Sequence, residues 1–311
     1  MKASSTVIYG PDVRKHISVR SQDIALASGA ITLFHRTTAL LKNVEPEFLV
    51  SRKYPSARRL ETVYECCKVY TEICTALSLL GGFYRPSYQA RAEEFEKHYS
   101  SFPELQRSIP NLPEKVSLHT GMKLRSDFSP IINKTVETWT ETRHALEATL
   151  RFFLSGFLRI DVRGPWIEFL HKSKGRMRWL FFQDYLSFYL ARLGLHGSPL
   201  VCAANLAFQA YDYQSFQRKV RKYGKYPLTR PFSFTSPILD VYFASTLVLF
   251  ALQDDGNVDQ GVMNAGGNYI GRVLYCRNVG SGTVDQWKNS RDLCVEGQRL
   301  YFGAKQQKTV L

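Results

Sequence analysis

The sequence predicts a mainly α-helical protein of the α+β class, in which two helical lobes precede a smaller, β-containing C-terminal part. Up to about residue 222, apolar residues recur at spacings of three and four, which is the helical period. Beyond residue 227, prolines, clusters of turn-forming residues and short β-branched runs replace that period. Hydrophobic residues make up 44% of the 311 residues, which is enough for a folded core.

The first helical lobe is expected over residues 21–110, after an N-terminal arm at residues 1–20. Its clearest helix begins near Ser56, because the apolar residues that follow form one stripe along a helix. Cys67 and Cys74 belong to this stripe. We therefore expect both thiols to be buried as small hydrophobic groups.

Residues 111–128 are expected to connect the first lobe to a second helical lobe at residues 129–226. Three prolines, at residues 103, 110 and 113, interrupt the helical pattern around the start of this connector. Pro130 then opens a long helix, since proline is tolerated in a first turn. A very aromatic stretch at residues 177–193 is expected at the centre of the second lobe.

The C-terminal region, residues 227–311, is expected to be rich in strands and turns. Residues 269–276 and 293–302 contain short apolar runs that predict the strands of a hairpin or small sheet. Residues 238–252 are almost entirely apolar, so their period does not decide between helix and strand. This run is about 15 residues long and contains Asp240, which predicts that it does not span a membrane.

The overall charge is strongly positive. Lys and Arg number 41 against 27 for Asp and Glu, giving a net charge of +14. Such an excess attracts nucleic acid and anionic lipid through non-specific electrostatics. The six cysteines form no CxxC pair, which favours a reducing compartment. We expect the cytoplasm, the nucleus or the interior of a virion.

Motifs for catalysis and cofactor binding are missing from the sequence. It contains no GxxxxGK[ST] or GxGxxG nucleotide loop, no GxSxG serine elbow and no HExxH zinc motif. His144 and Glu147 are three residues apart, but no second pair supports a metal site there. We therefore expect no catalytic residue, no metal ion and no cofactor.

Residues 213–239 combine six Lys or Arg, six aromatic residues and no acidic residue. Cations neutralise phosphates and aromatic rings stack on unpaired bases, which together suit single-stranded nucleic acid. A second basic cluster at residues 172–178 is expected in a loop between two helices. We expect the two clusters to face each other across a basic cleft between the lobes. The expected binding residues are Lys172, Lys174, Arg176, Arg178, Arg218, Lys219, Arg221, Lys222, Tyr223, Lys225, Tyr226 and Arg230.

Residues 223–244 contain the runs Leu228-Thr229-Arg230, Thr235-Ser236-Pro237 and Tyr242-Phe243-Ala244. This order resembles the central motif of FRG domains, which runs roughly YG, PTRLLD, an aromatic residue, TSP and an ALYFA-like segment. The acidic residue of that motif after the arginine is replaced here by Pro231-Phe232-Ser233. FRG domains are related to ADP-ribosyltransferases, so the resemblance implies an enzyme of that type with Arg230 in a pocket.

The charge and the two clusters favour a non-enzymatic protein that holds single-stranded RNA or DNA by its backbone, without sequence specificity. Such a protein would assemble as a homo-oligomer, in the manner of a viral nucleocapsid or capsid protein. Residues 1–20 or the C-terminal tail would then reach neighbouring subunits. Two alternatives stay open: an ADP-ribosyltransferase-like enzyme, and a basic scaffold that binds an acidic protein.

Overall fold

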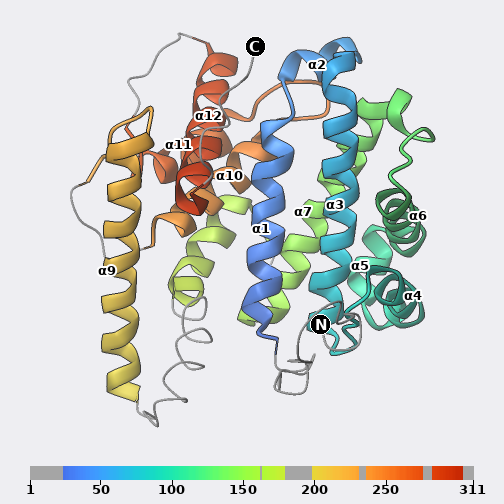
Figure 1. Ribbon diagram of the computed structural model, residues 1–311, viewed down its shortest axis with the longest axis horizontal. Coiled ribbons are helices and arrows are strands. Elements are labelled where there is room, and N and C mark those ends of the chain that lie inside the picture. The colour runs from blue at the N-terminus through green and yellow to red at the C-terminus, as the bar shows by residue number, and fades with distance from the viewer. Residues whose placement is uncertain (1–23, 162, 179–197, 231–235, 276–281, 304–311) are drawn as a thin grey trace, which may run out of the picture. The chain divides into compact units, whose positions relative to one another are not determined.

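The computed structural model describes residues 24–161, 163–178, 198–230, 236–275 and 282–303 (Figure 1). The expected N-terminal arm, most of the aromatic stretch and the C-terminal tail lie outside these residues. The chain forms two compact units: unit 1 comprises Met1–Arg36 and Tyr54–Ile160, and unit 2 comprises Thr37–Lys53 and Asp161–Leu311.

Unit 1 is built around one long helix, α3 (Ser56–Leu80), which packs against α4, α6 and α7. The apolar stripe predicts this helix correctly, and Cys67 and Cys74 are buried in it as expected. The N–H of Gly81 donates to the carbonyl oxygen of Leu77 and ends the helix. The other helices of unit 1 are α4 (Tyr88–His98), η4 (Tyr99–Ser101), α5 (Pro103–Ser108), α6 (Leu112–Arg125), η5 (Ile132–Lys134), α7 (Thr135–Leu158) and the first part of α1 (Leu26–Lys42).

The expected connector at residues 111–128 holds a helix, α6, within unit 1. Pro103 and Pro113 occupy the first turns of α5 and α6, where the missing N–H has no helical partner. Both prolines therefore begin helices. The chain passes between the units within α1, after Arg36, again after Lys53, and after α7, at Ile160.

Unit 2 is built around α10 (Pro237–Ala251), which packs against α9, α11 and α12. Almost every side chain of α10 is buried, and a helix that is apolar on all sides belongs in the centre of a core. Its neighbours include a helix at residues 166–178, because Trp166 stacks on Phe250 near the end of α10. The remaining helices of unit 2 are α2 (Pro46–Ser51), α9 (Ser198–Tyr223), α11 (Gln260–Ile270), α12 (Thr283–Phe302) and the end of α1.

The expected β-containing C-terminal part is wrong. The described residues after 227 form the helices α10, α11 and α12. Their β-type pairing is limited to two isolated bridges, Leu228–Leu274 and Leu252–Val258, and the described residues form no sheet. Residues 283–302 are helical because buried positions recur at the helical period along them, and Gly303 ends α12 in the left-handed conformation. The chain is therefore an all-α protein over its described part.

The apolar run at residues 238–252 corresponds to α10, a helix of 15 residues. Among the described helices, none combines the length and the apolar character that crossing a bilayer requires. This agrees with the expectation that the run does not span a membrane.

Candidate functional site

Exposed cations of unit 2 gather at the C-terminal end of α9. Arg218, Arg221 and Lys222 lie on its last turns and are exposed. Cations in the last turn also stabilise the helix, because its terminal carbonyl groups carry partial negative charge. Within the described part of the chain, neither Arg218 nor Arg221 forms a salt bridge. These two guanidinium groups are therefore open to an external anion.

Lys219 has a different role from its neighbours. Its ammonium donates a hydrogen bond to the carbonyl oxygen of Tyr301 and lies 5.8 Å from the centre of the Tyr301 ring. Tyr301 is in the last turn of α12, where carbonyl groups lack helical partners. Lys219 therefore joins α9 to the end of α12 and is not positioned as a ligand contact.

The chain that follows α9 is fixed by Glu296 of α12. Glu296 accepts a hydrogen bond from the backbone N–H of Lys225 at 3.2 Å and another from Arg299 Nε at 2.6 Å. Burial alone raises the pKa of Glu296, but the bonds from Arg299 and the Lys225 N–H outweigh it and hold the pKa below its ordinary value. Arg299 also donates to the carbonyl oxygen of Tyr223 at 3.0 Å. The Glu296 carboxylate thus binds the backbone N–H of Lys225 and the side chain of Arg299, whereas the side chain of Lys225 is exposed.

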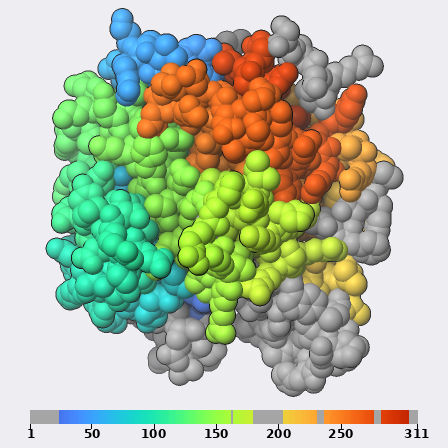
Figure 2. Space-filling model, turned by 180° about the vertical axis from the view of Figure 1, so that it is seen from behind, coloured from blue at the N-terminus to red at the C-terminus, as the bar shows by residue number. Residues whose placement is uncertain are grey.

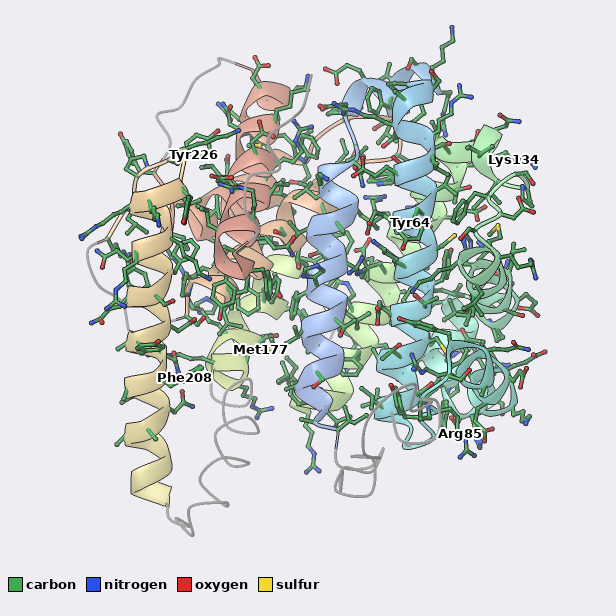
Figure 3. The ribbon with its side chains drawn as sticks, in the orientation of Figure 1. Tyr64, Arg85, Lys134, Met177, Phe208 and Tyr226 are labelled. Carbon is green, nitrogen blue, oxygen red and sulfur yellow. The ribbon has the colours of Figure 1, made fainter. Side chains whose placement is uncertain are left out.

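A cavity of about 580 Å³ opens beside this segment, and its described lining residues all lie between Gln217 and Arg230. We call it the cationic pocket, because Arg221, Lys225 and Arg230 line it and no carboxylate is among its described lining residues. Tyr226 also lines it, and Figure 3 shows that residue just beyond the C-terminal end of α9. Three cations around one hollow form a site for an anion.

The second basic cluster lies on a helix and not in the expected loop, since residues 166–178 are helical. Lys174 and Arg178 share the inner side of this helix: Lys174 Nζ lies 3.3 Å from Asp240 Oδ1, and Arg178 Nε donates to Gln209 Oε1 at 3.1 Å. Lys172 and Arg176 are exposed. Helical spacing therefore divides the four cations into an inner pair and an outer pair.

Asp240 is the acidic partner of several cations in unit 2. It is buried in the first turn of α10, where the helix dipole favours an anion. Burial raises its pKa, and Lys174, Arg272 and Arg230 oppose that rise. Lys174 and Arg272 are therefore largely committed to Asp240, while Arg230 faces both Asp240 and the cationic pocket.

The two basic clusters do not form one cleft in the described part of the chain. The residues that line the cationic pocket all lie between 217 and 230, and none comes from residues 172–178. Lys172 lines a separate hollow of about 450 Å³ together with Arg272 and Asn268 of unit 2. Figure 2 shows the yellow-green surface of residues 163–178 bordering the orange surface that includes α11. Arg221, Lys225 and Arg230 thus line one hollow of unit 2, and Lys172 lines another.

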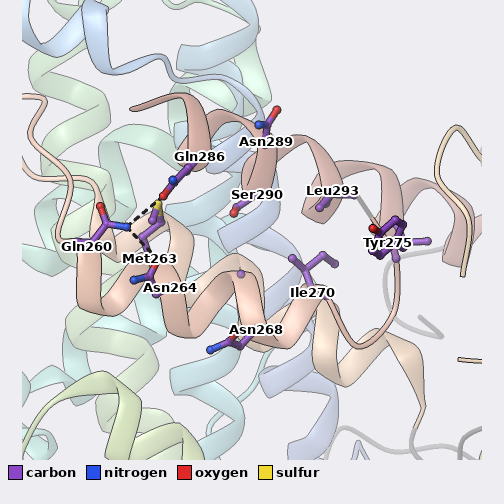
Figure 4. Close-up of a pocket in the computed structure, with 13 residues that line it drawn as sticks. Gln260, Met263, Asn264, Asn268, Ile270, Tyr275, Gln286, Asn289, Ser290 and Leu293 are labelled. Atoms are coloured by element: carbon purple, nitrogen blue, oxygen red, sulfur yellow. Dashed lines mark hydrogen bonds between the residues drawn. The ribbon is translucent and has the colours of Figure 1, made fainter. Parts of the chain in front are cut away.

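A third hollow, of about 630 Å³, lies between α11 and α12 (Figure 4). We call it the amide groove, since five carboxamide side chains and no charged side chain are among its described lining residues. Sequence reasoning missed this site, because it expected strands and turns where α11 and α12 lie. The five are Gln260, Asn264, Asn268, Gln286 and Asn289.

The comparisons with known proteins place the chain in no family. No family model, no curated protein and no solved structure matches it. The likeness to FRG domains is therefore limited to the short runs within residues 223–244.

The FRG-like segment divides between surface and core. Arg230 lines the cationic pocket, whereas Tyr242 and Phe243 are buried on α10. Residues 231–235, where the motif departs from that of FRG domains, lie outside the described residues. The second half of the motif thus serves the packing of α10.

A buried cysteine–histidine pair in unit 1 resembles a nucleophile with its base. Cys67 Sγ lies 3.3 Å from His119 Nδ1, and the His119 ring stacks on Tyr70. Burial raises the pKa of Cys67 to about 12 and, with help from Lys115, lowers the pKa of His119 to about 3. Both groups are therefore neutral at pH 7, which suits core packing and not nucleophilic attack. Among the described residues, no group of three His, Cys, Asp or Glu side chains is placed to hold a metal ion.

Proposed function

We propose that unit 2 binds single-stranded nucleic acid by its phosphates in the cationic pocket. The observation that supports this most directly is the presence of Arg221, Lys225 and Arg230 around one cavity whose described lining residues include no carboxylate. A phosphate that enters this cavity gains charge-assisted hydrogen bonds from Arg221, which forms no ion pair with any residue that the structure describes.

Two exposed tyrosines favour an unpaired strand over a duplex. Tyr223 is 52% exposed at the end of α9, and Tyr275 is 51% exposed. Aromatic rings beside cations give unpaired bases a surface for stacking, and this binding tolerates any sequence. The backbone of Tyr275 pairs with Pro227, which lines the cationic pocket, so this tyrosine lies next to the proposed phosphate site.

Assembly along the strand, as in a nucleocapsid, is the second part of the proposal. The segments expected to link subunits, residues 1–20 and the C-terminal tail, lie outside the described residues. The support for assembly therefore comes from composition. Copies of a chain with a net charge of +14 repel one another, and a polyanion bound along them would reduce that repulsion.

Charge reversal in the pocket tests the binding. Fluorescence anisotropy with a labelled single-stranded oligonucleotide should show affinity that falls at least tenfold in the Arg221→Glu, Lys225→Glu double variant. The matched control is Lys97→Glu with Lys134→Glu, which changes the net charge equally at exposed positions of unit 1. Equal losses in both double variants would show only a response to net charge and would contradict the pocket. Binding of acidic protein but no oligonucleotide would favour the scaffold.

A further inference from the structure

We propose that the amide groove between α11 and α12 binds a base of the nucleic-acid strand whose phosphates lie in the cationic pocket. This inference rests on the proposed function and adds a second contact to it. A volume of about 630 Å³ falls within the usual range for small-ligand sites. The groove is therefore large enough for a base.

The side chains of the groove fit an uncharged, planar group with donors and acceptors on its edge. Carboxamides present both kinds of group and pair with base edges through two hydrogen bonds at once. Gln260 Nε2 donates to Asn264 Oδ1 at 3.0 Å and to Gln286 Oε1 at 3.2 Å, which orients three of the amides (Figure 4). The amide nitrogens of Asn264 and Gln286 then remain as donors toward a ligand.

Tyr275 supplies a ring at the other end of the groove from Gln260, as Figure 4 shows. Its backbone N–H donates to the carbonyl oxygen of Pro227, which holds the residue in place while half of the side chain stays exposed. Between these ends, Gly267 and Gly271 line the groove without side chains. A Cβ atom at Gly267 would lie 3.6 Å from Ser290 Oγ, so a larger side chain there would enter the groove.

The surroundings of the groove favour a base over another neutral ligand. On one side, Leu274 of the groove forms a β-bridge with Leu228 of the cationic pocket. On another side, Asn268 lines both the groove and the hollow that contains Lys172 and Arg272. In a nucleotide chain, each uncharged base is attached to a sugar that lies between two negatively charged phosphates. A neutral site between two hollows that contain cations matches this arrangement.

Uncharged nucleosides test the groove without any contribution from phosphate. Saturation-transfer NMR with the full chain and adenosine, guanosine, cytidine or uridine should give a signal for at least one of them. Gly267→Leu should abolish that signal by filling the groove. The matched control is Gly261→Leu, the same exchange in α11 at a residue that does not line it. The Arg221→Glu, Lys225→Glu variant should keep the signal.

Oligonucleotides connect the two sites. Wild-type protein should bind a base-bearing strand about tenfold more tightly than an abasic strand of equal length, and Gly267→Leu should remove this difference. Salt-dependent binding that is equal for both strands, with no nucleoside signal, would overturn the inference and leave the proposed function standing. If neither strand binds, the proposed function fails. A nucleoside signal that Gly267→Leu abolishes would then still identify the groove as a base site, and the absence of any signal would overturn the inference. A methyl glucoside that gives a stronger signal than every nucleoside would also overturn the inference.

Discussion

The backbone N–H of Tyr275 donates a hydrogen bond of 2.8 Å to the carbonyl oxygen of Pro227. The N–H of Thr229 donates in turn to the carbonyl oxygen of Val273 at 3.3 Å. These bonds join the segment that lines the cationic pocket to the segment that leads out of the amide groove. A change that moves one segment should therefore affect the other, and the two sites are best tested together.

Gly224 determines how the chain leaves α9. A Cβ atom there would lie 2.7 Å from the carbonyl oxygen of Val220, a backbone atom that cannot move cheaply. Gly224→Ala should therefore lower the free energy of unfolding by at least about 1 kcal/mol and weaken oligonucleotide binding, because Lys225 and Tyr226 shift. Urea unfolding and anisotropy would measure the two effects.

Gly175 is the matched control for Gly224. It lies within the helical residues 166–178, and a Cβ atom there would meet nothing within 4 Å. Gly175→Ala should raise the free energy of unfolding by about 0.5–1 kcal/mol, since alanine favours the helix. If both variants destabilise the protein equally, the close approach at Gly224 is not the cause of its effect.

Asp240 and Lys174 should be energetically coupled. Removing the carboxylate with Asp240→Ala leaves the partly exposed Lys174 and Arg272 without their buried partner and should lower the free energy of unfolding by about 1–2 kcal/mol. Once Lys174→Met is present, the same change should cost less, with a coupling energy of about 0.5–3 kcal/mol. Urea unfolding of the wild type, both single variants and the double variant gives this energy. Strictly additive effects would contradict the ion pair.

Stability should fall in mild acid because two histidines of unit 1 are held neutral. Burial lowers the pKa of His119 to about 3 and that of His35 to about 4. Their stabilisation is complete above the unfolded pKa of about 6.5 and is lost as the pH falls toward the folded values. Between pH 7 and pH 5, each histidine should lower the free energy of unfolding by about 2 kcal/mol.

His119→Gln separates the two contributions. The variant should retain only the part of the acid loss that comes from His35, about half of the total. Urea unfolding at both pH values measures the loss for wild type and variant. An identical loss in the two proteins would show that His119 is not neutralised by burial.

Local pattern was enough to predict some elements and not others. The helix from Ser56 follows from one apolar stripe, and its burial of Cys67 and Cys74 agrees with the structure. The helices α11 and α12 could not be predicted in this way. Gly266 of α11 and Gly297 of α12 weaken the intrinsic helix preference, and both are buried against α10, where close approach requires a missing side chain. The close packing of these glycines depends on contacts with α10, which the sequence around each glycine does not reveal.

The candidate site shows the same limit. The pattern of charges in the sequence predicted Arg221, Lys225 and Arg230 as binding residues, and these three line one cavity. It also included Lys174 and Lys219, whose ammonium groups turn to Asp240 and Tyr301. A run of cations in a sequence does not reveal which carboxylates and carbonyl groups from distant segments will meet it.

The slope of affinity against salt tests the phosphate contacts most directly. If Arg221, Lys225 and Arg230 each neutralise one phosphate, the logarithm of the association constant should fall against the logarithm of salt with a slope near about −2. Arg221→Gln should make the slope shallower by about 0.7, whereas Lys97→Gln in unit 1 should leave it unchanged. A slope near zero in the wild type, or an equal change in both variants, would contradict binding of a phosphate backbone in the cationic pocket.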